Sequence, residues 1–191
     1  MNTLRNYKLL IALFALTTAW MPVSVRANAP EPTVSAALQG KQSTNKVRLR
    51  VWGFEVYDAR LFTVNGFSAE QFGDHRFALE LSYLRSFKGS DIAERSIDEM
   101  RNVTELTPAQ ADLWLKTMTA LFPDVQRGDR ITGVHVPGSG ARFYLNDRLL
   151  GDIADEAFSR SFFGIWLSPK TSQPRMRETL IGQTGGAPRT P

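Results

Sequence analysis

The chain contains no cysteine among its 191 residues, and this absence removes several classes of chemistry. Without cysteine there is no disulfide framework, no thiolate metal site and no cysteine nucleophile. Histidine is also scarce, because His75 and His135 are the two present and neither has other ligand residues at metal-binding spacing. We therefore expect each histidine to be a surface or strand residue, and we expect no metal site and no cofactor.

Long apolar runs are also missing, apart from one near the N-terminus. Leu9–Trp20 is apolar but shorter than the roughly 20 residues that a membrane-spanning helix needs, and Arg5 and Lys8 precede it. This pattern is typical of a secretory signal peptide. Two small-residue cleavage sites follow, at Val25-Arg26-Ala27 and Ala27-Asn28-Ala29. We favour the cut after Ala27, because the other cut would place Pro30 directly after it.

We therefore expect residues 1–27 to be a signal peptide and the mature protein to be periplasmic, without stable membrane insertion. The alternative is an uncleaved membrane anchor. Cleavage would remove three basic residues and no acidic one, so the totals of 23 basic and 19 acidic residues would become 20 and 19. This near balance of charge gives no case for nucleic-acid binding.

The rest of the chain is predicted to be one domain with short ends. Residues 34–182 carry the strand and helix patterns and are long enough to bury a sizeable core. Residues 28–33 contain two prolines and are predicted to be a flexible lead-in. Residues 183–191 are rich in glycine and proline, and we predict a disordered tail there.

Alternation of apolar and polar residues predicts strands in two parts of this domain. The expected strands are Lys46–Trp52, Phe54–Val64, Arg76–Leu84, Asp129–Val136, Ala141–Leu145 and Arg148–Ile153. In the first of them Val47 and Leu49 alternate with Arg48 and Arg50, so we expect the two arginines on a solvated face. The Pro-Gly-Ser-Gly loop at 137–140 lacks the following helix of a phosphate cradle, and it is predicted to connect a hairpin.

Two helices are predicted between the two groups of strands. Ser90 is expected to cap the first, which runs to about Arg101. The second has a fuller start signal, with Thr107 as N-cap, Pro108 at the first helical position and Gln110 completing a capping box. Its apolar stripe predicts a core-facing helix and comprises Ala111, Trp114, Leu115, Met118 and Phe122.

A third helix, close to the end of the chain, is apolar on nearly all sides. Its main stripe comprises Phe158, Phe162, Ile165 and Trp166. Phe163 and Leu167 fall outside that stripe, so the helix must be buried all round. Ser168-Pro169 ends it, and a last helix is expected at Gln173–Ile181. The order of elements predicts an α+β domain, with helices on one face of an antiparallel sheet.

At this point the sequence resembles the bacterial exported branch of the chalcone isomerase-like family. The segments that carry the resemblance, in matching order, are Trp52–Leu61, Leu81–Arg85 with the helix Ser90–Met100, Phe143–Gly151 and Phe162–Thr171. The resemblance implies an open-faced β-sandwich, in which a large antiparallel sheet is covered by helices and a ligand cleft lies between the layers. Some family members isomerise chalcones to flavanones, and others bind fatty acids without known chemistry.

The resemblance carries over poorly to the catalytic residues of the plant enzymes. Their arginine follows a Gly-x-Gly turn, whereas the corresponding Gly40-Lys-Gln-Ser43 has no arginine. Their early threonine falls on Trp52, their tyrosine near Ile92 and their asparagine near Glu99. Only the late threonine of a Ser-Pro-x-Thr context has a match, which is Thr171. We therefore expect chalcone isomerisation to be absent or very slow, because the cation and phenol that it requires are not matched.

Other residues are better candidates for a binding site. Tyr83 and Arg85 continue the apolar face of Leu79 and Leu81, so the arginine could meet a ligand carboxylate bidentately. Tyr57 could add a hydroxyl. The alternative is that Arg85 caps the sheet edge or pairs with an acidic neighbour, for which the candidates are Glu80, Asp91 and Glu94.

Three functions remain open from the sequence. The first is non-catalytic binding of a fatty acid or a similar apolar acid in the cleft between sheet and helices. The second is an isomerase or lyase of chalcone-like or other small substrates. The third is an envelope module that binds another protein, whose identity the sequence does not give.

The signal-peptide pattern yields the first test. We expect the exported protein to begin at Asn28 and to be recovered in the soluble periplasmic fraction. N-terminal sequencing of protein isolated from each cell fraction measures this directly. A chain that keeps Met1 and remains in the membrane fraction would contradict cleavage and would support the anchor.

Overall fold

The structure is a computed structural model, and it describes residues 42–43 and 46–182. The expected signal peptide, lead-in and tail, and the first part of the expected domain, lie outside the described residues. Within the described ranges, no helix has both the length and the apolar character needed to cross a membrane.

The described chain is built on one antiparallel sheet of seven strands, ordered β1-β3-β4-β5-β6-β7, with β2 also pairing with β3. The strands are β1 (Gln42–Ser43), β2 (Val47–Val51), β3 (Phe54–Thr63), β4 (Phe77–Tyr83), β5 (Arg130–Val136), β6 (Gly140–Leu145) and β7 (Arg148–Ile153). From β3 onward each strand pairs with the next strand in sequence. The longest connection between neighbouring strands joins β4 to β5 and contains two helices.

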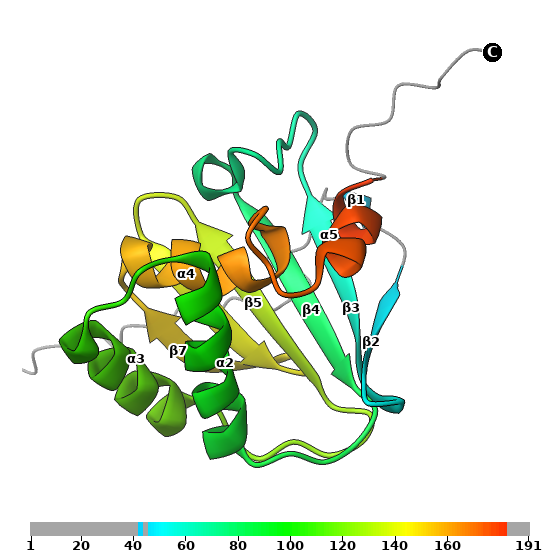
Figure 1. Cartoon of the computed structure of the whole chain (residues 1–191), viewed down its shortest axis with the longest axis vertical. Helices are drawn as coiled ribbons and strands as arrows, with labels where there is room; N and C mark the ends of the chain where they lie inside the picture. Colours follow the sequence, from blue (N-terminus) through cyan, green and yellow to red (C-terminus); the bar gives the residue numbers. More distant parts are fainter. Residues whose placement is uncertain (1–41, 44–45, 183–191) are drawn as a thin grey trace, which may run out of the picture. The chain divides into compact units, whose positions relative to one another are not determined.

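Four helices lie over one face of this sheet (Figure 1). They are α2 (Gly89–Val103), α3 (Pro108–Leu121), α4 (Glu156–Leu167) and α5 (Pro174–Ile181), and a short turn η1 (Phe72–Asp74) precedes β4. In Figure 1, α4 crosses the middle of the sheet, α3 lies toward β7, and α5 lies over β2 and β3. The predicted α+β class, an open-faced β-sandwich with one helical layer, is confirmed.

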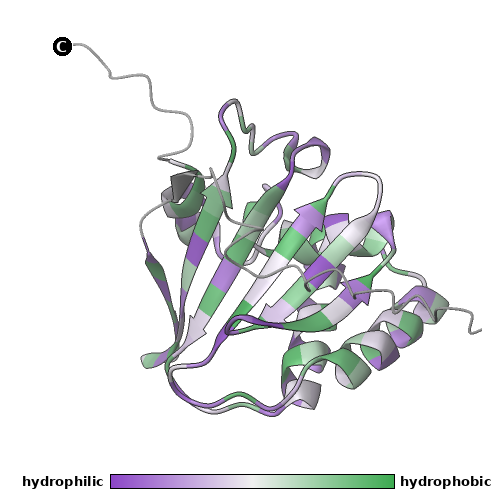
Figure 2. Ribbon diagram, turned by 180° about the vertical axis from the view of Figure 1, so that it is seen from behind, coloured by the Kyte–Doolittle hydropathy of each residue, from purple (hydrophilic) through white to green (hydrophobic). Residues whose placement is uncertain are grey.

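The strand alternation of the sequence separates the two faces of the sheet. Seen from the side opposite the helices, the strands show alternating hydrophilic and hydrophobic bands (Figure 2). In β4, Leu79, Leu81 and Tyr83 join the buried core under the helices, whereas Glu80 and Ser82 are only partly buried on the other face. Most of the large apolar residues therefore collect between the two layers, as a period of two requires. A smaller buried cluster of Ala78, Val134 and Tyr144 lies on the opposite face of the sheet.

The two helix starts between β4 and β5 differ in how well the sequence predicted them. In α3 the capping box is confirmed, because Thr107 Oγ1 accepts from the Gln110 amide at 3.2 Å and Gln110 Oε1 accepts from the Thr107 amide at 3.1 Å. The prediction that Ser90 caps α2 is wrong. The amide of Gly89 donates to Asp124 Oδ1 at 2.9 Å, so the cap comes from a residue that follows α3.

Helix α4 is buried as its all-round apolar sequence predicted. Its ring contacts run in several directions, since Phe162 stacks on Phe158 at 5.5 Å between centroids and meets Phe143 of β6 edge-on at 5.2 Å. Asp155 caps the helix by accepting from the Phe158 amide at 3.0 Å. The same carboxylate accepts from Trp114 Nε1 at 2.9 Å, which ties α4 to α3.

The burial of α4 predicts a large stability loss on truncation. Phe162→Ala should destabilise the protein by about 3–5 kcal/mol, because it empties a core aromatic site, and Trp166→Ala should have a similar effect. Denaturant unfolding at constant pH measures the loss. Leu113→Ala, on the exposed side of α3, is the control and should change little. Wild-type stability of both aromatic variants would show that α4 is not central.

Candidate ligand-binding pocket

A pocket of about 480 Å³ opens between the sheet and helices α2 and α4. Its sheet side is formed by β2, β3, β4 and β5, and its helical side includes Ile92 of α2 and Ile165 of α4. The buried side chains of Leu81, Phe122 and Phe162 add apolar surface to its lining. The size and lining are those of a site for an apolar small molecule.

Tyr57 and Tyr83 supply hydroxyl groups on the sheet side of this pocket. They are direct cross-strand partners on β3 and β4, and their rings meet edge-on at 6.2 Å between centroids. Trp166 Nε1 of α4 donates to the Tyr57 hydroxyl at 3.0 Å. Because that oxygen accepts from Trp166, its own hydrogen is left to donate. Within the described part of the chain, the Tyr83 hydroxyl makes no hydrogen bond, so it too can donate.

Both phenols are held in their protonated form. Burial raises the pKa of Tyr57 and of Tyr83 well above the usual range for tyrosine, since the ionised form loses its hydration. The hydrogen bond from Trp166 works against this rise at Tyr57, and the nearby charge of Glu99 adds to it. The pocket therefore presents two neutral donors rather than a phenolate.

Arg85 lies at the mouth of the pocket rather than inside it. Strand β4 ends at Tyr83, and after one further backbone hydrogen bond, from the Leu84 amide to the Val56 carbonyl at 2.9 Å, the chain bends away from the sheet. The alternation that predicted an inward side chain at Arg85 therefore no longer holds. The exposed guanidinium lies over the ring of Phe54 at 5.5 Å and over that of Phe87 at 5.8 Å. Among the described residues it forms no ion pair, so the alternative of an acidic partner is not what the structure shows.

A second polar group lies on the α2 side of the pocket. Glu99 is buried, forms a short ion pair with Arg95, and accepts from Ser172 Oγ at 2.7 Å and from Asn102 Nδ2 at 3.2 Å. Sequence reasoning did not choose Glu99 as a site residue, because a lone acidic residue in a helix carries no signal of burial. Its bond to Ser172 spans 73 residues and becomes visible only in the fold.

The structure also places the positions where the family's catalytic residues fall. Trp52, Ile92 and Glu99 all line the pocket, so those positions are on the site although their residue types differ. Thr171 is buried beside it, where its hydroxyl donates to the Ile165 carbonyl at 2.5 Å and accepts from the Gln173 amide at 3.1 Å. Of Gly40–Ser43, the first two residues lie outside the described ranges and the others form β1.

His135 is a strand residue of β5, as predicted, and lies away from the pocket in the core. Its ring nitrogens contact Ser159 Oγ at 2.7 Å and the Gly73 carbonyl at 2.9 Å, and it stacks on Phe77. Burial lowers the pKa of His135, because the charged imidazolium would lose its hydration. No cluster of metal-binding side chains occurs in the ranges that the structure describes.

Comparison with known proteins agrees with this architecture. The family model described as chalcone isomerase-like matches residues 45–182 of the chain. An uncharacterized protein from Haemophilus influenzae is 32% identical over 134 residues, which are 70% of this chain and 64% of that protein. The chain thus spans less than two thirds of the length of this relative.

A solved structure has the same fold. The fatty-acid binding protein of Arabidopsis thaliana superposes with a TM-score of 0.60, at 12% sequence identity, over 76% of this chain and 89% of that one. At this identity the likeness concerns the fold of the sheet and its helical layer, and it does not assign residues.

The protonated state of the two pocket tyrosines can be measured. The chain has four tyrosines, and we expect Tyr57 and Tyr83 not to ionise in the native protein below about pH 11, because burial raises their pKa. In an absorbance titration from pH 8 to 11, the Tyr57→Phe/Tyr83→Phe variant should therefore lose none of the wild-type tyrosinate signal. In urea the same variant should lose the signal of both phenols. A reduced native signal in the variant would contradict the buried, neutral state.

Proposed function

The chain belongs to the chalcone isomerase-like family, and on that premise we propose that it binds a fatty acid or a similar apolar carboxylic acid without catalysing a reaction. The observation that carries this proposal is an apolar pocket with two neutral hydroxyl donors inside and, at its mouth, an arginine that has no acidic partner in the part of the chain that the structure describes. A carboxylic acid with a long apolar tail has the matching arrangement of one anionic end and one apolar body.

The apolar part of the pocket accounts for the tail. Leu81 and Ile131 of the sheet face Phe162 and Ile165 of α4 across it. A tail between these side chains would be removed from water on both sides, which is favourable by about 25 cal/mol for each Å² buried. The volume of about 480 Å³ lies within the usual range for small-molecule sites.

The polar groups account for the acid end. Arg85 has no carboxylate partner among the described residues, so a ligand carboxylate would not have to displace one. Tyr83, the last residue of β4, is two residues away in the sequence and also lines the pocket, and Tyr57 is its cross-strand partner. Among the described residues the Tyr83 hydroxyl makes no hydrogen bond. A planar guanidinium and neighbouring hydroxyl donors form charge-assisted hydrogen bonds with a carboxylate.

Two further observations support binding over the other candidate functions. The chain has the fold of a protein that is named for fatty-acid binding. The space between sheet and helices is open rather than filled, whereas a module that served only protein contacts would not need a pocket there. An isomerase or lyase would need a reactive group in the pocket, and Thr171, the single match to the family pattern, uses its hydroxyl on backbone groups.

The proposal includes the periplasm as the place of binding. It rests on the charged, apolar and small-residue regions of residues 1–27, in the order of a secretory signal. The lack of cysteine is compatible with an oxidising compartment, since no free thiol would be exposed to it.

Replacement of Arg85 tests the head-group assignment. Arg85→Ala should weaken binding of a fluorescent long-chain fatty acid roughly ten- to a hundredfold, because a charged hydrogen bond is worth about 1.5–3 kcal/mol. Arg85→Lys should restore part of the affinity, since the charge remains but the bidentate fork is lost. Fluorescence titration of folded protein measures the dissociation constants.

Arg101→Ala is the matched control, because Arg101 is an exposed arginine of α2 that pairs with Asp98 and does not line the pocket. It should bind like wild type. Equal affinity in Arg85→Ala and wild type would remove Arg85 from the site. No fatty-acid binding by wild type would refute the proposed function and leave the protein-binding module as the better candidate.

A further inference from the structure

Three large apolar side chains are exposed together at the turn between β2 and β3. Val51, Trp52 and Phe54 have exposed fractions of 36%, 95% and 62%, and among the described residues only two other large apolar side chains are this exposed. We call these three residues the hairpin tip. Exposed apolar side chains that gather at one place usually mark a contact surface.

The conformation of the turn shows that folding does not require a tryptophan there. Trp52 has φ +48° and Gly53 has φ +84°, and Val51 pairs directly with Phe54 across the two-residue loop. Two-residue turns with positive φ at both central positions favour asparagine or aspartate followed by glycine. A bulky residue with positive φ is unusual. The tryptophan therefore occupies a position that local structure would give to a small polar residue, and it makes almost no contact with the rest of the fold.

The hairpin tip is also the mouth of the pocket. Val51, Trp52 and Phe54 line the pocket, as does Arg85, whose guanidinium lies over the Phe54 ring. Figure 1 shows the β2–β3 turn next to the end of β4, at one edge of the sheet. Whatever contacts the tip therefore also adjoins the opening through which a ligand must pass.

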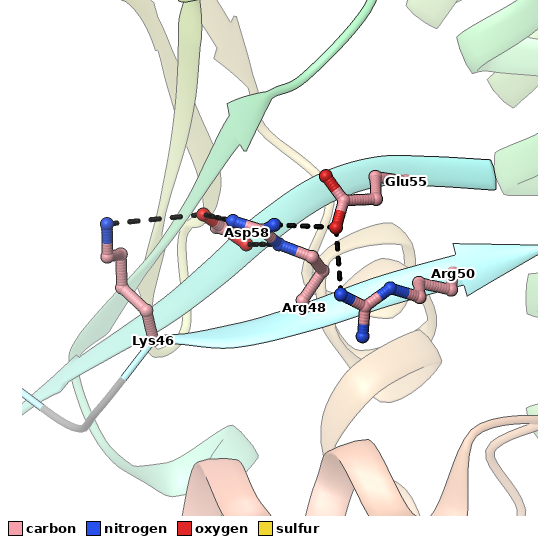
Figure 3. Close-up of polar contacts among 5 residues, drawn as sticks. All are labelled: Lys46, Arg48, Arg50, Glu55 and Asp58. Carbon is pink, nitrogen blue, oxygen red and sulfur yellow. Dashed lines mark hydrogen bonds and ion pairs between the residues drawn. The ribbon is translucent and has the colours of Figure 1, made fainter. Parts of the chain in front are cut away.

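The charges beside the tip favour an anionic partner. On the face of the hairpin away from the pocket, the cations Lys46, Arg48 and Arg50 form ion pairs with the carboxylates Glu55 and Asp58 (Figure 3). The hydrogen bonds from Arg48 lower the pKa of both carboxylates, so both stay ionised and leave the group with one excess positive charge. Arg85, which has no acidic partner among the described residues, adds a second positive charge. The exposed Asp91 also lines the pocket and offsets one of the two, so the net charge around the mouth remains positive.

We propose that the hairpin tip docks on an anionic phospholipid bilayer and brings the pocket mouth to the lipid surface. Tryptophan and phenylalanine partition into the interfacial layer of a bilayer, and arginine binds its phosphate groups. The docking is peripheral and reversible, because three apolar side chains offer far less buried area than a membrane-spanning segment. An acyl ligand could then exchange between the bilayer and the pocket without crossing open water.

Vesicle sedimentation tests this proposal with the complete chain. Vesicles of phosphatidylglycerol and phosphatidylcholine in equal amounts should bind wild type, and vesicles of phosphatidylcholine alone should bind it less. Trp52→Asn should lower the partition coefficient by about tenfold or more. This variant should keep or raise the unfolding midpoint, because asparagine suits a positive φ. The control is Leu113→Asn. Leu113 of α3 is 60% exposed and does not line the pocket, so vesicle binding of this variant should equal that of wild type.

A second measurement reports which tryptophan contacts the lipid. The chain has four tryptophans, and Trp114 and Trp166 are buried. In a Trp20→Phe background, brominated phosphatidylcholine in the vesicles should therefore quench Trp52 selectively. The quenching should disappear in Trp52→Asn. All variants are produced with the complete N-terminal region, so any membrane affinity of residues 1–41 is common to them.

Three outcomes would overturn the docking proposal. They are equal vesicle binding by Trp52→Asn and wild type, absence of quenching in the wild type, and a soluble dimer that Trp52→Asn dissociates, which would identify a second copy as the partner. Fatty-acid titration in vesicle-free buffer reports separately on the pocket. Failure of vesicle binding with intact fatty-acid affinity would refute the docking alone.

Discussion

The burial of α4 is the constraint on which the rest of the structure depends. Residues 161–167 of this helix are all buried, so this part cannot lie at the edge of a two-layer domain. The sheet covers one side of it and the other helices cover the rest. Its aromatic residues pack against β6 and fill the middle of the interlayer space. Ile165 and Trp166 of the same helix line the pocket together with side chains of β3. The pocket is the part of the interlayer space that side chains do not fill. The same helix therefore forms part of the core with one set of side chains and part of the pocket wall with another.

The hydrogen bond from Trp166 to Tyr57 joins α4 to the sheet and fixes how the Tyr57 hydroxyl is placed in the pocket. It couples α4 to the sheet across 109 residues of sequence, and it occupies the acceptor side of the Tyr57 hydroxyl. The hydroxyl hydrogen of Tyr57 is then left to donate toward the pocket. With Tyr83 beside it, the sheet side offers donors, whereas Glu99 on the α2 side offers an acceptor that is already engaged by Arg95, Asn102 and Ser172. On the proposed function, an acidic ligand would therefore lie with its carboxylate toward the sheet and Arg85, away from Glu99.

Sequence patterns predicted the elements better than the site. Period-two alternation, the Thr107 capping box and the all-round apolar α4 are local signals, and the structure contains all three. The cap of α2 was missed because Asp124, which follows α3, supplies it from 35 residues away. Arg85 was expected inside the cleft because alternation was extended beyond the last residue of β4. Glu99 and the full burial of His135 depend on partners from other elements, and no local pattern reports them. Tyr57 and Tyr83 line the pocket, and their role in binding stays a prediction. The hydrogen bond at Tyr57 depends on where α4 lies, which no local pattern reports.

Trp52 is the place where local and global rules disagree most clearly. A natural sequence usually satisfies turn chemistry, burial and solubility together, and a residue that violates all of them tends to serve function. Trp52 has a positive φ, is almost fully exposed and interrupts two strands that a small polar residue would connect more easily. The neighbouring strand residues follow the expected pattern: Arg48 and Arg50 lie on the solvated face with their acidic partners, as strand alternation predicts. The departure is thus confined to side chains at the mouth of the pocket, where a contact made by Trp52 would act without altering the pairing of the sheet.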